Sequence, residues 1–273
     1  MNNTLNRNLL PGEDWVYFEI YCGVNTSEFF LQKKLKPIIN KLLKSQVIDK
    51  WYFIRYSLPD SHLRIRFHLN KKKYIIKLIN LMNEIVKPLM NNNLVWDLKL
   101  CTYKREIERY GENTIQLVEE YFFQDTINVL LIIERSNGDS GRFVDMCSYL
   151  EKVIDLFEMT EEDVLSFLNR RQKEYKEEFS SNRETLKRLN KKYKTLLVEK
   201  DNYFDLNGLR CIATKLVELN KLSALQISLK SLLSSFIHMS VNRAFKTKQR
   251  LYEMIIYDFL NRKYESKKFR IGQ

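Results

Sequence analysis

The sequence predicts an α+β protein, with a ferredoxin-like βαββαβ antiparallel sheet in the N-terminal part and a helical C-terminal part packed on that sheet. The first hundred residues alternate between short aromatic or β-branched runs and apolar runs with helical spacing. From about residue 112 to 262, apolar residues recur every three or four positions and no proline follows Pro88. We therefore expect one continuous domain over residues 1–273, with a sheet-forming half at about 14–111 and a helical half at about 112–262.

The first three strands and their connections can be placed in order. The run WVYFEIYCG at 15–23 is typical of a strand, and a helix capped by Thr26 or Ser27 follows, with apolar positions as far as Leu43 and a kink expected at Pro37. A second strand is predicted at 51–56. It leads through the turn sequence SLPDS into a third strand at 62–69, so the two form a hairpin.

The rest of the chain is predicted in the same way. A second helix is expected at about 73–88, and a fourth strand follows the NNN turn at 94–103. Breaks in the long helical part are expected at SNGDSG (136–141), EMTEED (158–163) and DLNGLR (205–210).

Composition excludes several classes of protein. No stretch approaches the roughly 20 apolar residues of a membrane span, and the first residues lack a signal-peptide run, so we expect a cytoplasmic protein. The four cysteines are scattered, which favours reduced thiols over disulfides or a zinc site. Nucleotide-binding, nucleophile-elbow and zinc-protease motifs do not occur, and we expect neither a metal nor a cofactor. The net charge of +12 favours acidic partners, although solvated lysines that only increase solubility explain it equally simply.

The strand HLRIRFHL raises the first functional question. Its two-residue period places His62, Arg64, Arg66 and His68 on one face and four apolar residues on the other. Two arginines that point the same way can bind a carboxylate or phosphate bidentately. The alternative is a solvated face, or one with salt bridges to a neighbouring strand.

Two further segments carry candidate residues. If YKREIERYGE (103–112) is helical, Arg105 and Arg109 lie on one side of it and Gly111 ends it. The alternative is a helical turn stabilised only by its alternating acids and bases. In SSFIHMSVNRAF (234–245), His238 and Asn242 share a helix face, and a histidine there is suited to move a proton. A structural core histidine is the alternative.

Taken together, these segments resemble the C-terminal domain of class I lantibiotic dehydratases and the related small proteins of thiopeptide biosynthesis. The resemblance covers most of the chain, through DWVYFEIYCG, IDKWYFIRYSLPDSHLRIRFHL, YKREIERYGE, EYFFQDT and FIHMSVNRAF. In that family the domain eliminates glutamate from glutamylated Ser or Thr of a precursor peptide, and dehydroalanine or dehydrobutyrine remains. The resemblance thus implies a lyase.

The resemblance also implies roles for individual residues. The catalytic residues would be Arg64, Arg66, Arg105 and His238, with Arg105 preferred to Arg109 from its motif position alone. Four further residues would bind substrate: His62, Tyr103, Arg109 and Asn242. Glu112 stands where the family commonly has a second glycine, which leaves the shape of that turn open.

The same resemblance implies partners and leaves alternatives. The chain looks like the free-standing half of a split dehydratase, which would need a precursor peptide with its leader and a separate glutamylation protein, but no direct contact with nucleic acid. A homodimer is left open. Some relatives are instead pyridine synthases, which join two dehydroalanines in a formal [4+2] cycloaddition. A third alternative is a non-catalytic module that binds the leader peptide.

Overall fold

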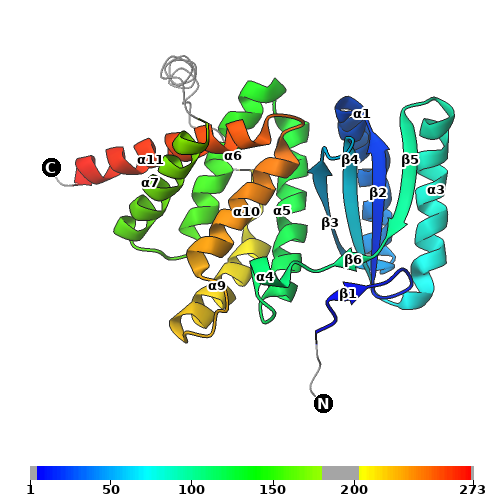
Figure 1. Ribbon diagram of the computed structural model, residues 1–273, viewed down its shortest axis with the longest axis horizontal. Coiled ribbons are helices and arrows are strands. Elements are labelled where there is room, and N and C mark those ends of the chain that lie inside the picture. Colours follow the sequence, from blue (N-terminus) through cyan, green and yellow to red (C-terminus); the bar gives the residue numbers. More distant parts are fainter. Residues whose placement is uncertain (1–4, 180–202, 272–273) are drawn as a thin grey trace. The chain divides into compact units, whose positions relative to one another are not determined.

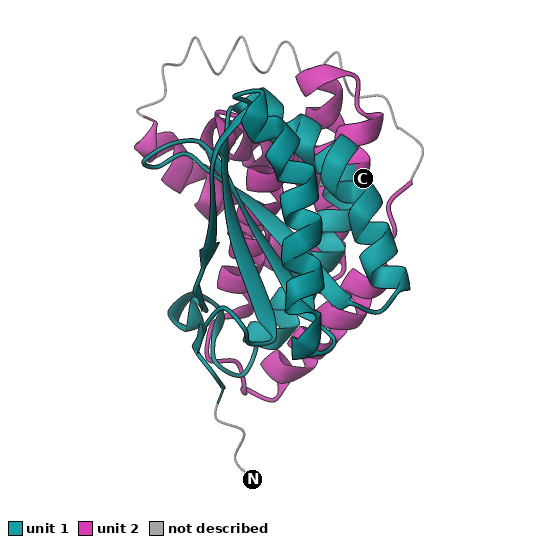
Figure 2. Ribbon diagram, turned by 90° about the vertical axis from the view of Figure 1, so that its right-hand side faces the viewer, with its two compact units in different colours: residues 1–130 teal, residues 131–273 magenta. Residues whose placement is uncertain are grey.

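The computed structural model describes residues 5–179 and 203–271. The chain divides into two compact units, residues 1–130 and 131–273, which Figure 2 colours separately. The division falls within helix α5 (Ile115–Arg135).

Unit 1 contains a four-stranded antiparallel sheet in the spatial order β3-β4-β2-β5 (Figure 1). Its strands are β2 (Trp15–Cys22), β3 (Ile48–Tyr56), β4 (His62–Leu69) and β5 (Val95–Cys101). Helical segments connect β2 to β3 and β4 to β5. They are α1 (Val24–Phe29), η1 (Phe30–Leu35), α2 (Lys36–Lys44), η2 (Lys72–Tyr74) and α3 (Ile75–Asn91). The predicted order of strands and helices is therefore confirmed.

One face of this sheet forms the core of unit 1. In the register of β2 and β4, Phe18 lies opposite Ile65 and Ile20 opposite Leu63, and these four side chains are buried. Helix α2 packs against β3, and α3 packs against β5. Because side chains alternate along a strand, the residues between these apolar positions point to the opposite face of the sheet.

The first helical connection differs from the single kinked helix that we predicted. A π-helical segment, η1, separates α1 from α2, and the irregularity therefore precedes Pro37. Pro37 lies in the first turn of α2, directly after η1, and it has no backbone N–H to donate to the preceding helical turn.

A second, two-stranded sheet in unit 1 was not predicted. Strands β1 (Asn8–Leu9) and β6 (Tyr103–Lys104) pair with each other, and Leu9 lies opposite Tyr103. Within residues 103–112, β6 is followed by the single helical turn α4 (Ile107–Tyr110), which Gly111 ends with a φ of +80°. The possibility that the whole segment 103–112 is helical, with Arg105 and Arg109 on one side, is therefore excluded, because strand pairing extends the backbone at Tyr103 and Lys104.

Unit 2 is mainly helical, as predicted. Besides the end of α5, its described helices are α6 (Gly138–Asp155), α7 (Glu161–Glu178), α9 (Asn207–Lys221), α10 (Leu229–Ala244) and α11 (Gln249–Ile271). Thr160 caps α7 by accepting a hydrogen bond from the Asp163 N–H at 3.2 Å, at the predicted break. The predicted loop at 136–141 is wrong in extent, since α6 already begins at Gly138. Residues 180–202 of the predicted helical part lie outside the described residues.

Two further predictions can be compared with the structure. All four cysteines are unpaired, as expected for reduced thiols. Across residues 5–179 and 203–271, no helix has both the length and the apolar character that crossing a membrane requires.

Candidate functional site

The polar face of β4 in unit 1 holds the first group of predicted residues. His62, Arg64 and Arg66 alternate with buried apolar residues along the strand, as their spacing predicts. Their surroundings differ, because each lies opposite a different residue of β2: His62 opposite Tyr21, Arg64 opposite Glu19 and Arg66 opposite Tyr17.

Arg66 lies among tyrosine rings and is only 6% exposed. Its guanidinium carbon is 4.5 Å from the ring centre of Tyr17, 4.8 Å from that of Tyr103 and 5.4 Å from that of Tyr52. Such contacts attract a cation to the face of the ring. Within the described part of the chain, Nε and Nη1 of Arg66 have no hydrogen-bond partner. Buried donors without partners are rare in proteins, so these two N–H groups are suited to an anion from outside the chain.

Arg66 remains positively charged despite this burial. Burial alone favours the neutral form, but the oxygens of Tyr52, Tyr103 and Tyr17 outweigh it and raise the pKa of Arg66 above its ordinary value. A small cavity of about 20 Å³ adjoins the guanidinium, which is room for roughly one water molecule. Besides Arg66, Tyr52 and Tyr103, its lining includes Glu106 and Tyr110.

Arg105 is equally buried but fully paired. Its Nε donates to Glu119 Oε1 at 2.7 Å, its Nη2 to Glu119 Oε2 at 2.8 Å and its Nη1 to the Asn6 carbonyl at 3.0 Å. Glu119, on α5, also accepts a hydrogen bond from the Tyr103 hydroxyl at 2.9 Å, and Tyr103 accepts one from the Tyr52 hydroxyl at 2.8 Å. Each nitrogen of Arg105 therefore donates a hydrogen bond within the chain, and its partner Glu119 also holds the hydroxyl of Tyr103 beside Arg66.

Arg64 is matched by a carboxylate of the neighbouring strand. Its Nε lies 3.3 Å from Glu19 Oε1, and its guanidinium stacks 3.7 Å from the ring centre of Tyr56. The hydroxyls of Tyr17 and Tyr21 also donate to Glu19. Burial alone raises the pKa of Glu19, but these two hydrogen bonds and the charge of Arg64 outweigh it and leave that pKa below its ordinary value. Arg64 is thus held by a charged partner, whereas Arg66 is not.

His62 has a structural environment. Its Nδ1 lies 2.8 Å from the Asp60 carbonyl oxygen, which can only accept, so Nδ1 carries the proton. Its Nε2 accepts a hydrogen bond from Arg64 Nε at 3.1 Å, and its ring stacks on Tyr21. Both ring nitrogens are thus engaged within unit 1.

The remaining predicted residues are Arg109, His238 and Asn242. Arg109, on α4, is partly exposed, and its Nη1 lies 3.7 Å from Glu106 Oε2. His238 and Asn242 belong to unit 2, where α10 carries both one turn apart. His238 Nδ1 lies 2.8 Å from Glu253 Oε2 of α11. The structure therefore groups His62, Arg64, Arg66, Tyr103 and Arg105 in unit 1.

Sequence reasoning missed the carboxylates that pair with the predicted residues. Glu19 lies between Tyr17 and Tyr21 at alternate positions of β2, a pattern that could have placed it on the polar face. Glu119 shares a helix face with the buried Ile115 and Phe122, and a carboxylate among apolar positions indicates a buried cation. Across the described ranges, no group of three or more His, Cys, Asp or Glu residues could hold a metal ion.

Comparison with known proteins gives consistent relationships. The family described as lantibiotic biosynthesis dehydratase C-term matches residues 15–264. The chain is 30% identical over 182 residues to the subtilin biosynthesis protein SpaB of Bacillus subtilis, and 30% identical over 170 residues to the nisin biosynthesis protein NisB of Lactococcus lactis subsp. lactis. The matches cover 64% and 60% of this chain but only 17% and 16% of those relatives.

A solved structure shares the fold. The tRNA-dependent lantibiotic dehydratase MibB from Microbispora sp. 107891 matches 92% of this chain and 29% of its own, with a TM-score of 0.65 and 19% sequence identity. The family match spans both units and includes every predicted site residue from His62 to Asn242. The chain belongs to the lantibiotic biosynthesis dehydratase C-terminal family.

Proposed function

We propose that this chain is a lyase that matures a ribosomally made peptide of the lantibiotic or thiopeptide type. It removes glutamate from glutamylated Ser or Thr by β-elimination and leaves dehydroalanine or dehydrobutyrine. Family membership supports the general assignment. The observation that carries it is the buried guanidinium of Arg66, which keeps two N–H groups without a partner among the described residues.

The reaction needs what Arg66 can offer. A base takes the α-proton of the esterified residue, the electron pair forms the Cα–Cβ double bond, and the Cβ–O bond breaks to release a glutamate carboxylate. Negative charge therefore develops on the leaving oxygens. Preorganised donors aimed at such oxygens stabilise the transition state more than the ground state, and a planar guanidinium matches both carboxylate oxygens.

We assign removal of the α-proton to His238. A histidine is the side chain most often used for proton transfer near neutral pH, and 28% of this one is exposed. We propose that His238 takes the α-proton of the esterified residue and that Arg66 binds the carboxylate of the leaving glutamate.

The other predicted residues receive narrower roles. Arg64 adds positive charge to the same face while Glu19 restrains it. Arg105 acts through Glu119 on Tyr103 and is a positioning residue, which refines the catalytic role expected from the resemblance. His62 holds Arg64, and Tyr103 lines the cavity. Arg109 and Asn242, neither of them buried, are proposed to bind the peptide.

The partners are proposed from the same reasoning. The chain spans about a sixth of the length of the SpaB and NisB relatives that it matches. We propose that a separate protein supplies glutamylation and that the substrate is a precursor peptide that carries its leader. Co-purification of the chain with both partners at low salt would support this division, since charge steering of a +12 chain weakens as salt rises.

The test is direct incubation with a peptide that carries a glutamyl ester on serine. Release of free glutamate together with a dehydroalanine product supports the proposal. Ester hydrolysis back to serine, or binding without release, contradicts it and in the second case indicates a binding module. A parallel incubation with an already dehydrated precursor tests for the pyridine synthase, because only that enzyme forms a macrocycle. Arg170 lies on the exposed face of α7, so Arg170→Lys serves as the matched control for the change Arg66→Lys.

A further inference from the structure

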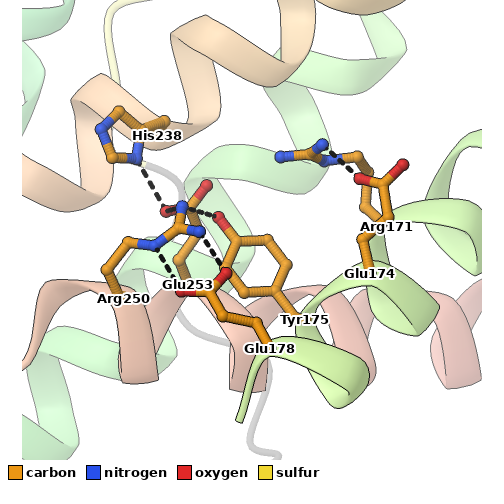
Figure 3. A network of polar contacts seen from close by, with 7 residues as sticks. All are labelled: Arg171, Glu174, Tyr175, Glu178, His238, Arg250 and Glu253. Carbon is orange, nitrogen blue, oxygen red and sulfur yellow. Dashed lines mark hydrogen bonds and ion pairs between the residues drawn. The ribbon is translucent and has the colours of Figure 1, made fainter.

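A second polar network lies in unit 2, where α7, α10 and α11 meet (Figure 3). Its centre is Glu253 of α11, whose side chain is 1% exposed. Figure 3 shows His238 and Arg250 both directed toward this carboxylate. The proposed function uses His238 but gives Glu253 no task.

The contact between Glu253 and His238 fixes the state of the imidazole. His238 Nδ1 lies 2.8 Å from Glu253 Oε2. An ionised carboxylate only accepts hydrogen bonds, so Nδ1 carries the proton in the neutral ring. The lone pair of that ring is therefore on Nε2. A carboxylate beside one ring nitrogen commonly determines which tautomer the other nitrogen presents.

Burial of Glu253 is costly for the fold. Within the described ranges, Glu253 Oε1 is buried and has no hydrogen-bond partner. An unsatisfied buried oxygen destabilises the folded state, and an apolar side chain of similar size would avoid that cost. Stability alone therefore does not explain a carboxylate at this position. The need to orient His238 does explain it.

Arg250 also contacts this carboxylate. Its Nη1 donates to the Tyr175 hydroxyl at 2.6 Å and lies 3.5 Å from Glu253 Oε2, while its Nε donates to Glu178 Oε1 at 3.3 Å. Tyr175 and Glu178 belong to α7, so Arg250 connects the buried carboxylate to a third helix. Glu253 Oε2 thus contacts both His238 and Arg250.

We propose that Glu253 is a positioning residue, which holds His238 in the Nδ1–H tautomer so that Nε2 accepts the α-proton. This inference rests on the proposed function for its catalytic consequence but not for the tautomer itself. Glu253 does not touch the substrate. Its effect passes through the imidazole.

The first experiment reads the tautomer without any reaction. In ¹⁵N-labelled full-length protein, at a pH where the ring is neutral, His238 should show a protonated Nδ1 and an unprotonated Nε2. In Glu253→Gln the amide can donate to Nδ1 as well as accept from it, so the Nε2–H tautomer should become populated. An Nε2–H tautomer in the unchanged protein, or an unaltered Nδ1–H tautomer in Glu253→Gln, would overturn the inference.

The second experiment measures glutamate release in a double-mutant cycle. Glu253→Gln should slow release by about 10- to 100-fold, the range found for groups that orient a metal-binding histidine in the same way. In a His238→Ala background the same change should cause no further loss. An equal loss in both backgrounds would mean a general structural role. Glu174 of α7, which Figure 3 also shows, is partly exposed, and Glu174→Gln is the matched control. Its rate of glutamate release should stay within about twofold of the unchanged protein.

Two controls separate the possible failures. If Glu253→Gln does not fold, Glu253→Asp retains the charge but draws it away from Nδ1, and the same loss of release is expected. If His238→Ala retains full activity, the proposed proton transfer by His238 is wrong. The tautomer measurement still decides whether Glu253 sets the state of the ring.

Discussion

Arg66 and Arg105 occupy neighbouring parts of unit 1 and differ mainly in what they contact. Their exposed fractions are 6% and 7%, and both are connected to Tyr103, Arg66 through the ring face and Arg105 through Glu119. Arg105 uses all of its nitrogens on the protein, whereas Nε and Nη1 of Arg66 remain without partners among the described residues. Burial therefore does not distinguish an arginine with a structural role from one that can bind an anion. The number of hydrogen-bond partners within the protein does.

This difference predicts opposite consequences when each arginine is replaced. Removal of a fully paired buried cation leaves its carboxylate uncompensated, so the cost falls on stability. Removal of an unpaired buried cation does not lower the stability of the fold, but it removes an anion site and should therefore lower activity.

The largest effect is expected for Arg105→Ala. Because Glu119 would stay buried without its bidentate partner, the free energy of unfolding should fall by about 3–5 kcal/mol in urea denaturation. Arg109→Ala, whose partly exposed side chain only approaches Glu106, should change it by less than about 0.5 kcal/mol. The double change Arg105→Met with Glu119→Leu should recover most of the loss. Equal effects of the two single changes would contradict the comparison.

The next effect concerns activity and is expected for Arg66. Arg66→Lys keeps the charge but loses the planar pair of donors, and Arg66→Met loses both. Each should slow glutamate release by about 10²- to 10³-fold. Arg66→Met should leave the melting temperature unchanged or raise it, since an unpaired buried charge disappears. A clear drop in melting temperature together with normal release would show that Arg66 is structural like Arg105.

The smallest effect should come from Glu19, which restrains Arg64 on the same face. Since the pKa of Glu19 is lower in the folded protein, its contribution to stability is present above the unfolded pKa and is lost as the pH falls through the folded pKa. Glu19→Gln should therefore lower the free energy of unfolding by about 1 kcal/mol near neutral pH. Relative to wild type, this difference should shrink below about pH 4. A difference that grows toward acid would contradict the assigned pKa direction.

Local periodicity was sufficient for most of the fold. The strand at 62–69 was predicted to the residue, because alternation is strict and a turn precedes it. The predicted loop at 136–141 failed for a physical reason. Small polar residues favour helix starts as well as loops, and here the chain turns at Gly138, with a φ of +68°, and enters α6 directly.

The site was only partly predictable, since its key contacts join distant segments. Spacing placed Arg64 and Arg66 on one face, but nothing local to Arg105 indicates its pairing with Glu119 of α5, or the strand pairing of Tyr103 with Leu9. Motif position favoured Arg105 over Arg109 without distinguishing what each one does. The role of each side chain thus depends on its contact partners, and a local sequence pattern does not reveal partners that are distant in the sequence.

The tyrosines around Arg66 have a consequence for how the site responds to alkali. Burial raises the pKa of Tyr17 and of Tyr103 well above the ordinary value, and Glu19 and Tyr52 respectively add to this. Both phenols therefore stay neutral at pH values where an exposed tyrosine already ionises. At those pH values no phenolate of Tyr17 or Tyr103 competes with an incoming anion for the guanidinium of Arg66.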